Sequence, residues 1–298
     1  MPILIFVEVV GGLGNQMFQY AFYEKLRKCY GNDKVKLHIG YFKEIRDNKG
    51  YELNKVFSIQ GGGNFHDVIT NLLDDKMDFF SRVRRKIFGF KSSYYIEGKD
   101  LSYKENIFSL DKNRDIYLRG LWQSEKYFSD IKDEILEIFK FPIITDLKNK
   151  KILNSITNSN SVSIHVRRGD YISNSTYNEI LGNACDSDYY IKAINKIYEL
   201  IDNPIFYIFS DDINWVKENL GIVKKLKVQY IDWNNGQNSF IDMQLMSLCK
   251  NNIIANSTFS WWGAWLNKNE NKVVIAPKRW FLAKKINNDI IPDNWIKI

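Results

Sequence analysis

The sequence lacks paired cysteines, internal repeats and long apolar runs. The three cysteines, Cys29, Cys185 and Cys249, lie far apart among 298 residues. They have neither the spacing of a zinc site nor the density of a disulfide-stapled domain, and are typical of reduced intracellular thiols. No stretch approaches the roughly 18 unbroken apolar residues of a membrane-spanning helix. We therefore expect a cytoplasmic protein that is not embedded in a membrane.

The composition that is present is that of a folded globular chain. Hydrophobic residues make up 45% of the sequence, aromatic residues 15% and charged residues 26%, without the depletion of apolar residues that marks disorder. A chain of this length can bury the cores of two ordinary domains. The formal net charge of +7 favours polyanionic or phosphorylated partners, or an anionic membrane surface.

The N-terminal residues predict a strand, a glycine turn and a helix. Residues 2–10 are almost wholly apolar, residues 11–16 read Gly-Gly-Leu-Gly-Asn-Gln, and residues 17–28 have apolar positions at helical spacing. Exposed amides at the start of such a helix could hold a phosphate, and a tight turn without a ligand is the alternative. Met17 stands where the dinucleotide fingerprint has its third glycine, which argues against a nicotinamide or flavin site.

A basic and aromatic segment lies in the first half of the chain. Residues 78–90 combine phenylalanines with arginines and a lysine. Such a segment could lie on an anionic membrane or cover a hydrophobic groove. We favour an ordinary packed helix.

The composition changes in the Asn-, Ser-, Thr- and Lys-rich stretch 143–160, where the hydrophobic period is lost. We place a boundary near residue 150, which gives an N-terminal domain of residues 1–150 and a C-terminal domain of residues 151–298. Beyond it, strands alternate with helices; the expected strands are 162–167, 205–210, 227–231, 253–255 and 272–276. This alternation predicts an α/β fold with a parallel, doubly wound sheet.

A doubly wound sheet brings the loops after its strands to one edge, where such folds bind ligands. The loops of this chain contribute Arg167, Arg168, Asp211, Asp212, Asp232, Ser257 and Ser260. Asp211 and Asp212 could face this edge or cap the next helix. Asp242, early in an apolar helix, is either a partner of the helix dipole or an acceptor for the N–H groups of a base.

Two segments at this edge predict an anion site. Residues 163–171 read Ser-Ile-His-Val-Arg-Arg-Gly-Asp-Tyr at the end of a strand, with a surface strand carrying solvated arginines as the alternative. Residues 257–263 open a helix with hydroxyls and amide N–H groups. Together with Arg167, whose planar fork grips two phosphate oxygens, they would neutralise a diphosphate without a metal. The only Asp-x-Asp, residues 186–188, is better explained by Asp188 as a helix N-cap than by a metal ligand.

Three long motifs resemble those of the α-1,2-fucosyltransferases, glycosyltransferase family 11. They are the glycine turn and helix of residues 11–21, His-Val-Arg-Arg-Gly-Asp-Tyr at 165–171, and Asn-Ser-Thr-Phe-Ser-Trp-Trp-Gly-Ala-Trp-Leu at 256–266. Their order is that of the family, and they span almost the whole chain. The resemblance implies a GT-B architecture of two Rossmann-like domains facing a cleft, with an acceptor-side N-terminal domain and GDP-β-L-fucose on the C-terminal one. It also implies an inverting, metal-independent transfer of fucose to the 2-OH of a galactoside, without a cofactor.

Related fucosyltransferases with the same His-x-Arg-Arg motif imply roles for single residues. Arg167 would bind the donor diphosphate and offset leaving-group charge, His165 would help to hold the nucleotide, and Asp242 would accept the guanine N–H groups. The further donor-binding residues that the resemblance implies are Asn15, Ser257, Thr258, Phe259 and Ser260. Asp170 is the candidate to orient or deprotonate the acceptor hydroxyl.

Two other classes of protein are alternatives. A nucleic-acid-binding protein would account for the net charge and for the basic run 82–86, but no nucleic-acid-binding motif accompanies them. A dinucleotide-dependent oxidoreductase is opposed by the missing glycine. We expect GDP-fucose and a galactoside acceptor as partners, and no nucleic acid. The acceptor could be a lipid-linked oligosaccharide, for which a basic surface would favour peripheral contact with the inner membrane.

Overall fold

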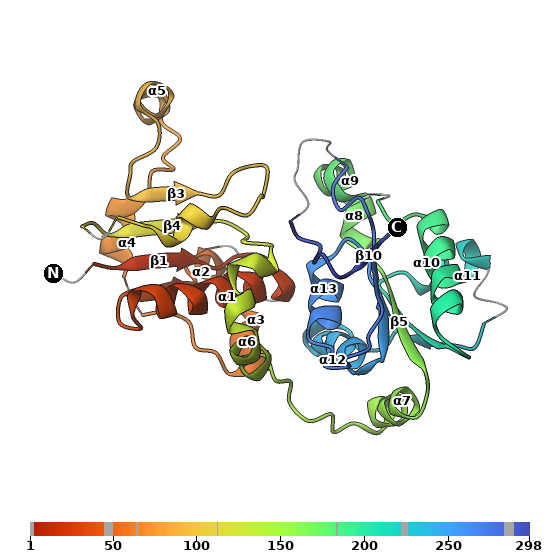
Figure 1. Ribbon diagram of the computed structural model, residues 1–298. Helices are drawn as coiled ribbons and strands as arrows, with labels where there is room; N and C mark the ends of the chain where they lie inside the picture. The colour runs from red at the N-terminus through yellow and green to blue at the C-terminus, as the bar shows by residue number, and fades with distance from the viewer. Residues whose placement is uncertain are drawn as a thin grey trace. The chain divides into compact units, whose positions relative to one another are not determined.

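The computed structural model describes residues 3–44, 50–63, 65–111, 113–182, 184–221, 226–282 and 289–298, with the side chains of residues 43, 44, 170, 176 and 177 left outside the description. The chain forms two compact units, Met1–Ile138 and Phe139–Ile298. Each unit is built on one parallel sheet with helices (Figure 1). The predicted α/β class with two Rossmann-like domains is therefore confirmed. No described helix is both long enough and apolar enough to cross a membrane.

The first unit contains a four-stranded parallel sheet in the order β2-β1-β4-β3. Its strands are β1 (Ile5–Glu8), β2 (Val35–His38), β3 (Tyr94–Ile96) and β4 (Ile116–Arg119). Its α-helices are α1 (Leu13–Tyr30), α2 (Tyr41–Glu44), α3 (Glu52–Phe57), α4 (His66–Leu72), α5 (Phe79–Phe88) and α6 (Lys132–Ile138), with short 3-10 turns at Glu105–Phe108, Glu125–Tyr127 and Ser129–Ile131. Every residue of β1 is buried, as the apolar N-terminal run predicts.

Helix α1 begins at Leu13, earlier than its apolar period predicts. The Leu13 backbone N–H donates to the Glu52 carboxylate at 2.9 Å, and Gln16 Nε2 donates to the Gly11 carbonyl at 2.7 Å. Gly11 has a φ of +77°, a conformation that glycine adopts without strain. The protein's own buried carboxylate thus occupies the helix N-terminus, and the structure favours the tight turn over the predicted phosphate cradle.

The second unit contains a six-stranded parallel sheet in the order β10-β9-β8-β5-β6-β7. Its strands are β5 (Ser161–Val166), β6 (Ile205–Ser210), β7 (Val228–Ile231), β8 (Asn251–Ile253), β9 (Val274–Ala276) and β10 (Ile296–Lys297). Its α-helices are α7 (Leu147–Thr157), α8 (Gly169–Ser173), α9 (Ser175–Leu181), α10 (Ser187–Leu200), α11 (Ile213–Asn219), α12 (Phe240–Leu248) and α13 (Thr258–Trp265), with a 3-10 turn at Gly236–Asn238. These elements follow the predicted alternation.

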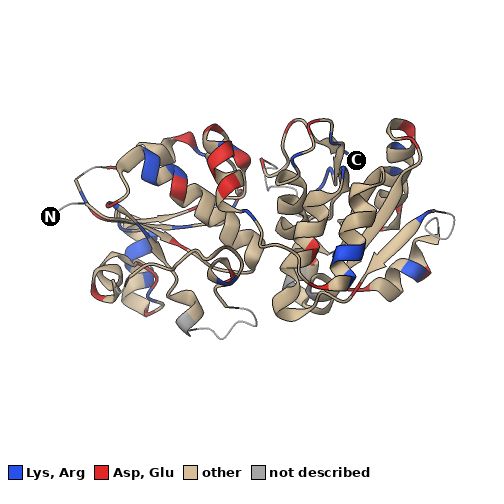
Figure 2. Cartoon of the chain, turned by 90° about the horizontal axis from the view of Figure 1, so that it is seen from below, with Lys and Arg blue, Asp and Glu red and all other residues tan. Residues whose placement is uncertain are grey.

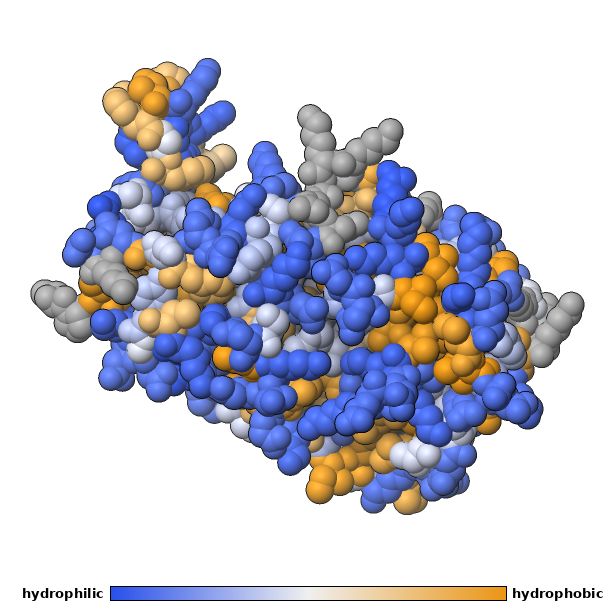
Figure 3. All heavy atoms as spheres, viewed as in Figure 1, coloured by the Kyte–Doolittle hydropathy of each residue, from blue (hydrophilic) through white to orange (hydrophobic). Residues whose placement is uncertain are grey.

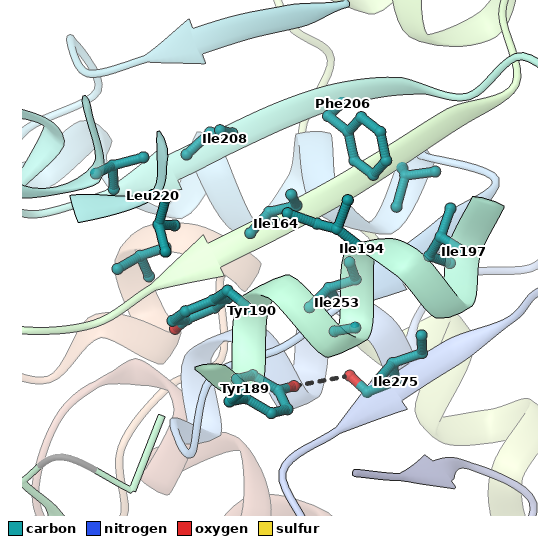
Figure 4. Close-up of a cluster of buried hydrophobic side chains, with 14 of the residues drawn as sticks. Ile164, Tyr189, Tyr190, Ile194, Ile197, Phe206, Ile208, Leu220, Ile253 and Ile275 are labelled. Atoms are coloured by element: carbon teal, nitrogen blue, oxygen red, sulfur yellow. Dashed lines mark hydrogen bonds between the residues drawn. The ribbon is translucent and has the colours of Figure 1, made fainter. Parts of the chain in front are cut away.

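Helices cover both faces of this second sheet. Phe206 and Ile208 of β6 pack with Tyr190 and Ile194 of α10 (Figure 4). The neighbouring Tyr207 joins a separate cluster with residues of α7 and α12, because successive side chains of a strand point to opposite faces. Burial on both sides explains why all residues of β5 are buried.

The two units divide at Phe139 rather than near residue 150. Residue 150 lies inside α7, which buries Ile152 and Ile156 in the core of the second unit. Asn149 of the same helix donates to the Asn234 side chain at 2.8 Å. The polar stretch that suggested a linker is therefore a surface helix with a narrow apolar stripe.

Helix α5 differs from the packed helix that its sequence predicts. The carboxylate of Asp78 caps it by accepting the Ser81 N–H at 2.9 Å, but none of its residues is buried. Phe79, Phe80 and Phe88 are 73%, 83% and 78% exposed. In Figure 1 the helix stands clear of the β3 edge of the sheet. The prediction of a packed helix is wrong.

Candidate active site

The strand order of the second unit places a ligand site between β5 and β8. The chain runs from β5 through β6 to β7 on one side, and then returns to β8, β9 and β10 on the other. Open α/β sheets bind ligands outside the carboxyl ends of their strands at such a switch point. Arg167 follows β5 directly, and Ser257 lies in the loop after β8. The two predicted anion-binding segments therefore flank one switch point.

The Arg167 guanidinium is held at this switch point by Asp211, which follows β6. Arg167 Nη1 lies 2.8 Å from Asp211 Oδ2, and the two side chains are 33% and 26% exposed. The other carboxylate oxygen accepts the Arg168 backbone N–H at 2.9 Å. The Tyr171 ring centre lies 5.6 Å from the Arg167 guanidinium carbon. The ion pair therefore holds the planar guanidinium of Arg167 at the edge of the sheet where β5 and β6 end.

Gly169 permits the close approach of Asp211. A Cβ atom at position 169 would stand 2.7 Å from Asp211 Oδ2 and 3.4 Å from its Cγ. Any larger residue would push the carboxylate away from its position beside Arg167. The glycine after the strand therefore serves the geometry of the ion pair as well as the turn.

Arg168 and Asp212 have structural roles next to this pair. Arg168 Nε lies 3.5 Å from Asp212 Oδ2, and its guanidinium carbon lies 4.1 Å from the centre of the Trp215 ring. Asp212 is the N-cap of α11 and accepts the Trp215 N–H at 3.0 Å. The two adjacent aspartates therefore have different roles: Asp211 binds Arg167 at the sheet edge, and Asp212 caps the helix.

His165 lies at the end of β5 and is 6% exposed. Its Nδ1 atom makes no hydrogen bond within the part of the chain that the structure describes, and the Phe259 ring centre lies 5.8 Å from the imidazole. Burial, followed by the charge of Arg167, lowers the pKa of His165 to about 3. The imidazole is therefore neutral near pH 7. A buried nitrogen without a partner is costly, and a ligand that hydrogen-bonds to it would remove that cost.

The loop after β8 opens α13 with Ser257 as the N-cap, whose Oγ accepts the Phe259 N–H at 3.4 Å. Thr258 and Phe259 are half-buried and lie at the positive end of the helix dipole. Ser260 is fully buried, and its hydroxyl donates to the Ser257 carbonyl at 3.3 Å. The Ser260 hydroxyl thus shapes the turn, while Thr258 and Phe259 remain partly accessible.

Asp242 lies in the first turn of α12, which leads from β7 to β8. Its Oδ1 accepts Asn234 Nδ2 at 2.7 Å, and Asn234 exchanges hydrogen bonds of 2.8 and 3.0 Å with Asn149. A helix that connects two parallel strands starts at the edge where the strands end. Asp242 therefore lies at the ligand-binding edge and also near the positive end of its helix, which fits both predicted alternatives.

Asn15 belongs to the switch point of the first sheet, between β1 and β4. Its Oδ1 accepts Gln123 Nε2 at 2.9 Å, which links the first turn of α1 to the loop after β4. A Cβ atom at Gly11 would stand 2.8 Å from Asn15 Nδ2, so the amide lies closely over the glycine turn. Its predicted approach to the reacting centre stays a prediction.

The predictions for the two aspartates Asp170 and Asp188 have different outcomes. Asp170 falls in α8, but its side chain is outside the described residues, so its role at the acceptor hydroxyl stays a prediction. Asp186 rather than Asp188 caps α10, because its carboxylate accepts the Tyr189 N–H at 2.9 Å. Asp188 pairs instead with Lys192 at 2.6 Å. Among the described residues, no group of three His, Cys, Asp or Glu comes together as a metal site.

Asn256 is a residue of this site to which the sequence assigns no role. Its Nδ2 donates to the carbonyls of Leu181 and Trp280 at 2.9 and 3.0 Å, and its own carbonyl accepts the Tyr171 hydroxyl at 3.2 Å. Asn256 thus joins the loops that follow β5, β8 and β9. Its position directly before a hydroxyl-rich helix start is a signal in the sequence, but its partners are 75 and 24 residues away.

Comparison with known proteins decides the family. The sequence model of Glycosyl transferase family 11 matches residues 87–298 of the chain. These residues include the whole second unit and its switch point. The chain belongs to this family. The family 11 chain is therefore a glycosyltransferase, and the nucleic-acid-binding and oxidoreductase alternatives are set aside.

Its basic and acidic residues are mixed over both units (Figure 2).

Similarity to two glycosyltransferases of Escherichia coli extends over nearly the full length of the chain. The chain is 35% identical over 304 residues to an alpha-1,2-colitosyltransferase of Escherichia coli, covering 99% of each chain. It is 34% identical over 317 residues to the O-antigen biosynthesis glycosyltransferase WbnK of Escherichia coli, covering 97% of this chain and 98% of that one. A galactoside 2-alpha-L-fucosyltransferase of Caenorhabditis elegans is 27% identical over 207 residues, covering 65% of this chain and 56% of its own.

Two solved structures match the chain at low sequence identity. NodZ alpha-1,6-fucosyltransferase soaked with GDP-fucose matches with a TM-score of 0.47 at 13% identity, covering 89% of this chain and 93% of that chain. A mutant of Arabidopsis thaliana FUT1 in complex with GDP matches with a TM-score of 0.49 at 12% identity, covering 98% of this chain and 72% of that chain.

Proposed function

We propose that this family 11 glycosyltransferase transfers L-fucose from GDP-β-L-fucose to the 2-OH of a terminal galactose, with inversion to an α-1,2 linkage. The observation that carries the proposal is the placement of Arg167 and of the α13 N-terminus on either side of one switch point. The names of two relatives, an alpha-1,2-colitosyltransferase and a galactoside 2-alpha-L-fucosyltransferase, support the position of transfer.

In this proposal the donor nucleotide lies across the carboxyl edge of the second sheet. Arg167 and the amides of α13 bind the diphosphate, because a guanidinium and a helix N-terminus both favour phosphate oxygens. Thr258 and Phe259 contact the ribose and phosphates, with Ser257 and Ser260 holding the turn that presents them. Neutral His165 offers its buried Nδ1 to the nucleotide, and the Asp242 carboxylate accepts the guanine N–H groups.

The transfer itself needs two events at one carbon. The acceptor 2-OH oxygen attacks C1 of fucose from the face opposite the diphosphate, and the bond from C1 to the phosphate oxygen breaks. GDP leaves with the electron pair, and Arg167 offsets the charge that develops on it. The proton of the hydroxyl passes to a base, for which we propose Asp170. Neither a metal nor a cofactor takes part in this scheme.

The first unit would supply the acceptor side. Asn15 is proposed to approach the reacting centre from the glycine turn, where Gln123 fixes its side chain. The acceptor is proposed to be a galactoside of an O-antigen or a glycolipid-linked glycan, made at the cytoplasmic face of the membrane. The O-antigen assignment of the relative WbnK supports this class of acceptor.

A second donor is favoured by one specific similarity. The relative that is 35% identical over nearly the whole chain is a colitosyltransferase, and colitose is L-fucose without its 3-hydroxyl. The same nucleotide site would serve either donor, and only contacts to one sugar hydroxyl would distinguish them. A site that hydrogen-bonds this hydroxyl would reject the donor that lacks it.

One experiment tests both candidates. Purified enzyme is incubated with GDP-fucose or GDP-colitose and a panel of β-galactosides, and the product linkage is read by NMR. We expect an α-1,2 linkage to galactose, with faster transfer of fucose. Transfer of colitose alone would replace the donor, and a linkage to another hydroxyl would overturn the assignment. GDP should also raise the melting temperature while NAD does not, because only a ligand of the native state stabilises it.

A further inference from the structure

Helix α5 presents an apolar face to solvent at the edge of the first unit. Phe79, Val83 and Ile87 fall close together on a helical wheel, and Phe80 extends the same arc to about 100° of the helix surface. Phe80 and Ile87 are 83% and 66% exposed. Figure 3 shows this helix at the upper left, with hydrophobic and hydrophilic side chains side by side on its surface. Apolar side chains so exposed mark an interaction site.

Cations border this apolar arc. Arg82 and Lys86 lie along one side of it on the helical wheel. Arg84 lies along the other side, and its guanidinium pairs with Asp74. The surrounding segment, residues 76–91, contains the cations Lys76, Arg82, Arg84, Arg85, Lys86 and Lys91, and Asp78 as its only carboxylate. An apolar stripe flanked by arginine and lysine is the pattern of a helix that lies in the interface of an anionic membrane.

Polar contacts centred on Asp74, rather than apolar packing, attach α5 to its unit. Asp74 is 5% exposed and accepts hydrogen bonds from the Arg84 guanidinium and from the Lys91 N–H. Burial by itself raises the pKa of Asp74, but these two donors hold it below its ordinary value. Arg85 donates to the carbonyls of Asp74 and Lys76. These contacts fix the helix from its polar side, so its apolar face points away.

The helix is formed before any partner binds. Asp78 caps its N-terminus through the Ser81 N–H, and Gly89 ends it with a φ of +73°, where its N–H bonds to the Arg85 carbonyl at 2.9 Å. An isolated helix of this length is marginal in water. Because the caps and the Asp74 contacts hold it, binding does not have to supply the free energy of helix formation.

The charges select the occupant of this face. A second copy of the chain would bring the same cations against one another, which opposes self-association through α5. Nucleic acid would satisfy the cations but would leave the exposed phenylalanines on a helical stripe that does not track a phosphate backbone. Anionic lipids satisfy both, because head-group phosphates meet the cations while the apolar arc enters the acyl boundary. We propose that α5, together with the flanking residues 76–91, docks the protein on an anionic membrane surface.

Vesicle sedimentation tests this docking with the full chain. Vesicles of phosphatidylcholine mixed with phosphatidylglycerol are compared with pure phosphatidylcholine vesicles, at low salt and at about 0.5 M NaCl, where exposed charges are screened. We expect binding to the mixed vesicles at low salt and a large loss of binding in the other conditions. Arg82→Glu/Lys86→Glu should weaken binding at least about thirtyfold, since each cation near such a surface contributes about fivefold.

Matched variants separate the helix from general charge. Lys150→Glu/Lys151→Glu changes two exposed cations of α7 by the same amount and should leave binding nearly unchanged. Phe80→Ser/Ile87→Ser should abolish binding, while Phe80→Leu/Ile87→Leu should retain it. All four variants should keep the melting temperature, because the altered side chains are exposed.

Several outcomes would overturn the proposal. The wild-type protein could fail to sediment with the mixed vesicles, or bind them equally well after the α5 substitutions. Tight binding of an oligonucleotide without vesicle binding would assign the face to nucleic acid instead. A dimer that Phe80→Ser/Ile87→Ser dissociates, seen by analytical ultracentrifugation without vesicle binding, would assign it to a second copy.

Discussion

Asp211 holds Arg167 with one carboxylate oxygen, 2.8 Å from Nη1, and holds the backbone of the following residue with the other. The guanidinium and the turn that carries it are therefore fixed by one group from the neighbouring strand. An arginine fixed in this way loses little further side-chain entropy when an anion binds. The same carboxylate limits the net positive charge at the site, so orientation rather than charge alone has to account for binding.

Replacement of Arg167 by lysine tests this orientation. Arg167→Lys keeps the charge but loses the planar fork, so the affinity for GDP should fall about ten- to a hundredfold. Isothermal titration calorimetry measures the change. Arg168→Lys is the matched variant: it should lower the melting temperature by removing the contact with Trp215, and should leave GDP affinity within about threefold. The reverse pattern would exchange the roles of the two arginines.

Gly169→Ala should reduce activity because the added methyl group displaces the Asp211 carboxylate. The new methyl group would stand 2.7 Å from Asp211 Oδ2, so the carboxylate has to move and the Arg167 ion pair is lost. We expect the crowding to lower the free energy of unfolding by about 1–2 kcal/mol. We also expect kcat/KM for the donor to fall at least about tenfold. Gly221→Ala in the same unit meets no atom of the described residues within 4 Å and should change neither quantity. Normal activity of Gly169→Ala would remove the positioning role of Asp211.

Local pattern was sufficient to predict the sheet of the second unit and its binding edge. Strands buried on both faces read as apolar runs, and β6 matches its predicted residues 205–210. Once strands alternate with helices, the topology itself brings Arg167, Asp211 and Ser257 to one edge. These site residues were therefore predictable without any knowledge of contacts.

Features that depend on long-range contacts could not be predicted in this way. The carboxylate at the start of α1 comes from Glu52, 39 residues from Leu13, so the glycine turn looked like an empty anion site. The apolar period of α5 is the same whether the helix is packed or exposed, because the period does not say what covers the face. The sequence favours Asp188 as the cap of α10, two residues after the observed cap Asp186, because both aspartates are suitable caps by residue type.

Asp242→Asn tests the proposed recognition of guanine. A carboxylate accepts both the N1 and the 2-amino protons of guanine, so the wild-type enzyme should bind GDP more tightly than inosine diphosphate, which lacks the 2-amino group. The variant should lose about ten- to a hundredfold of GDP affinity and most of this preference. Asp202→Asn, which alters an exposed aspartate between α10 and β6 at the opposite edge of the sheet, is the control and should behave as wild type. An unchanged preference in Asp242→Asn would leave Asp242 with its role at the helix dipole.

The pH dependence of stability tests the state of His165. Its pKa is lowered to about 3 by burial and by Arg167, so between that value and the ordinary 6.5 the unfolded chain binds a proton that the native protein does not. The free energy of unfolding should therefore fall as pH decreases, and from pH 7 to pH 5 this one group accounts for about 2 kcal/mol. Urea unfolding of His165→Gln should show a decrease smaller by that amount. Equal decreases in wild type and His165→Gln would show that His165 becomes protonated in the native protein near pH 6, and the neutral imidazole proposed to hold the nucleotide would have to be abandoned.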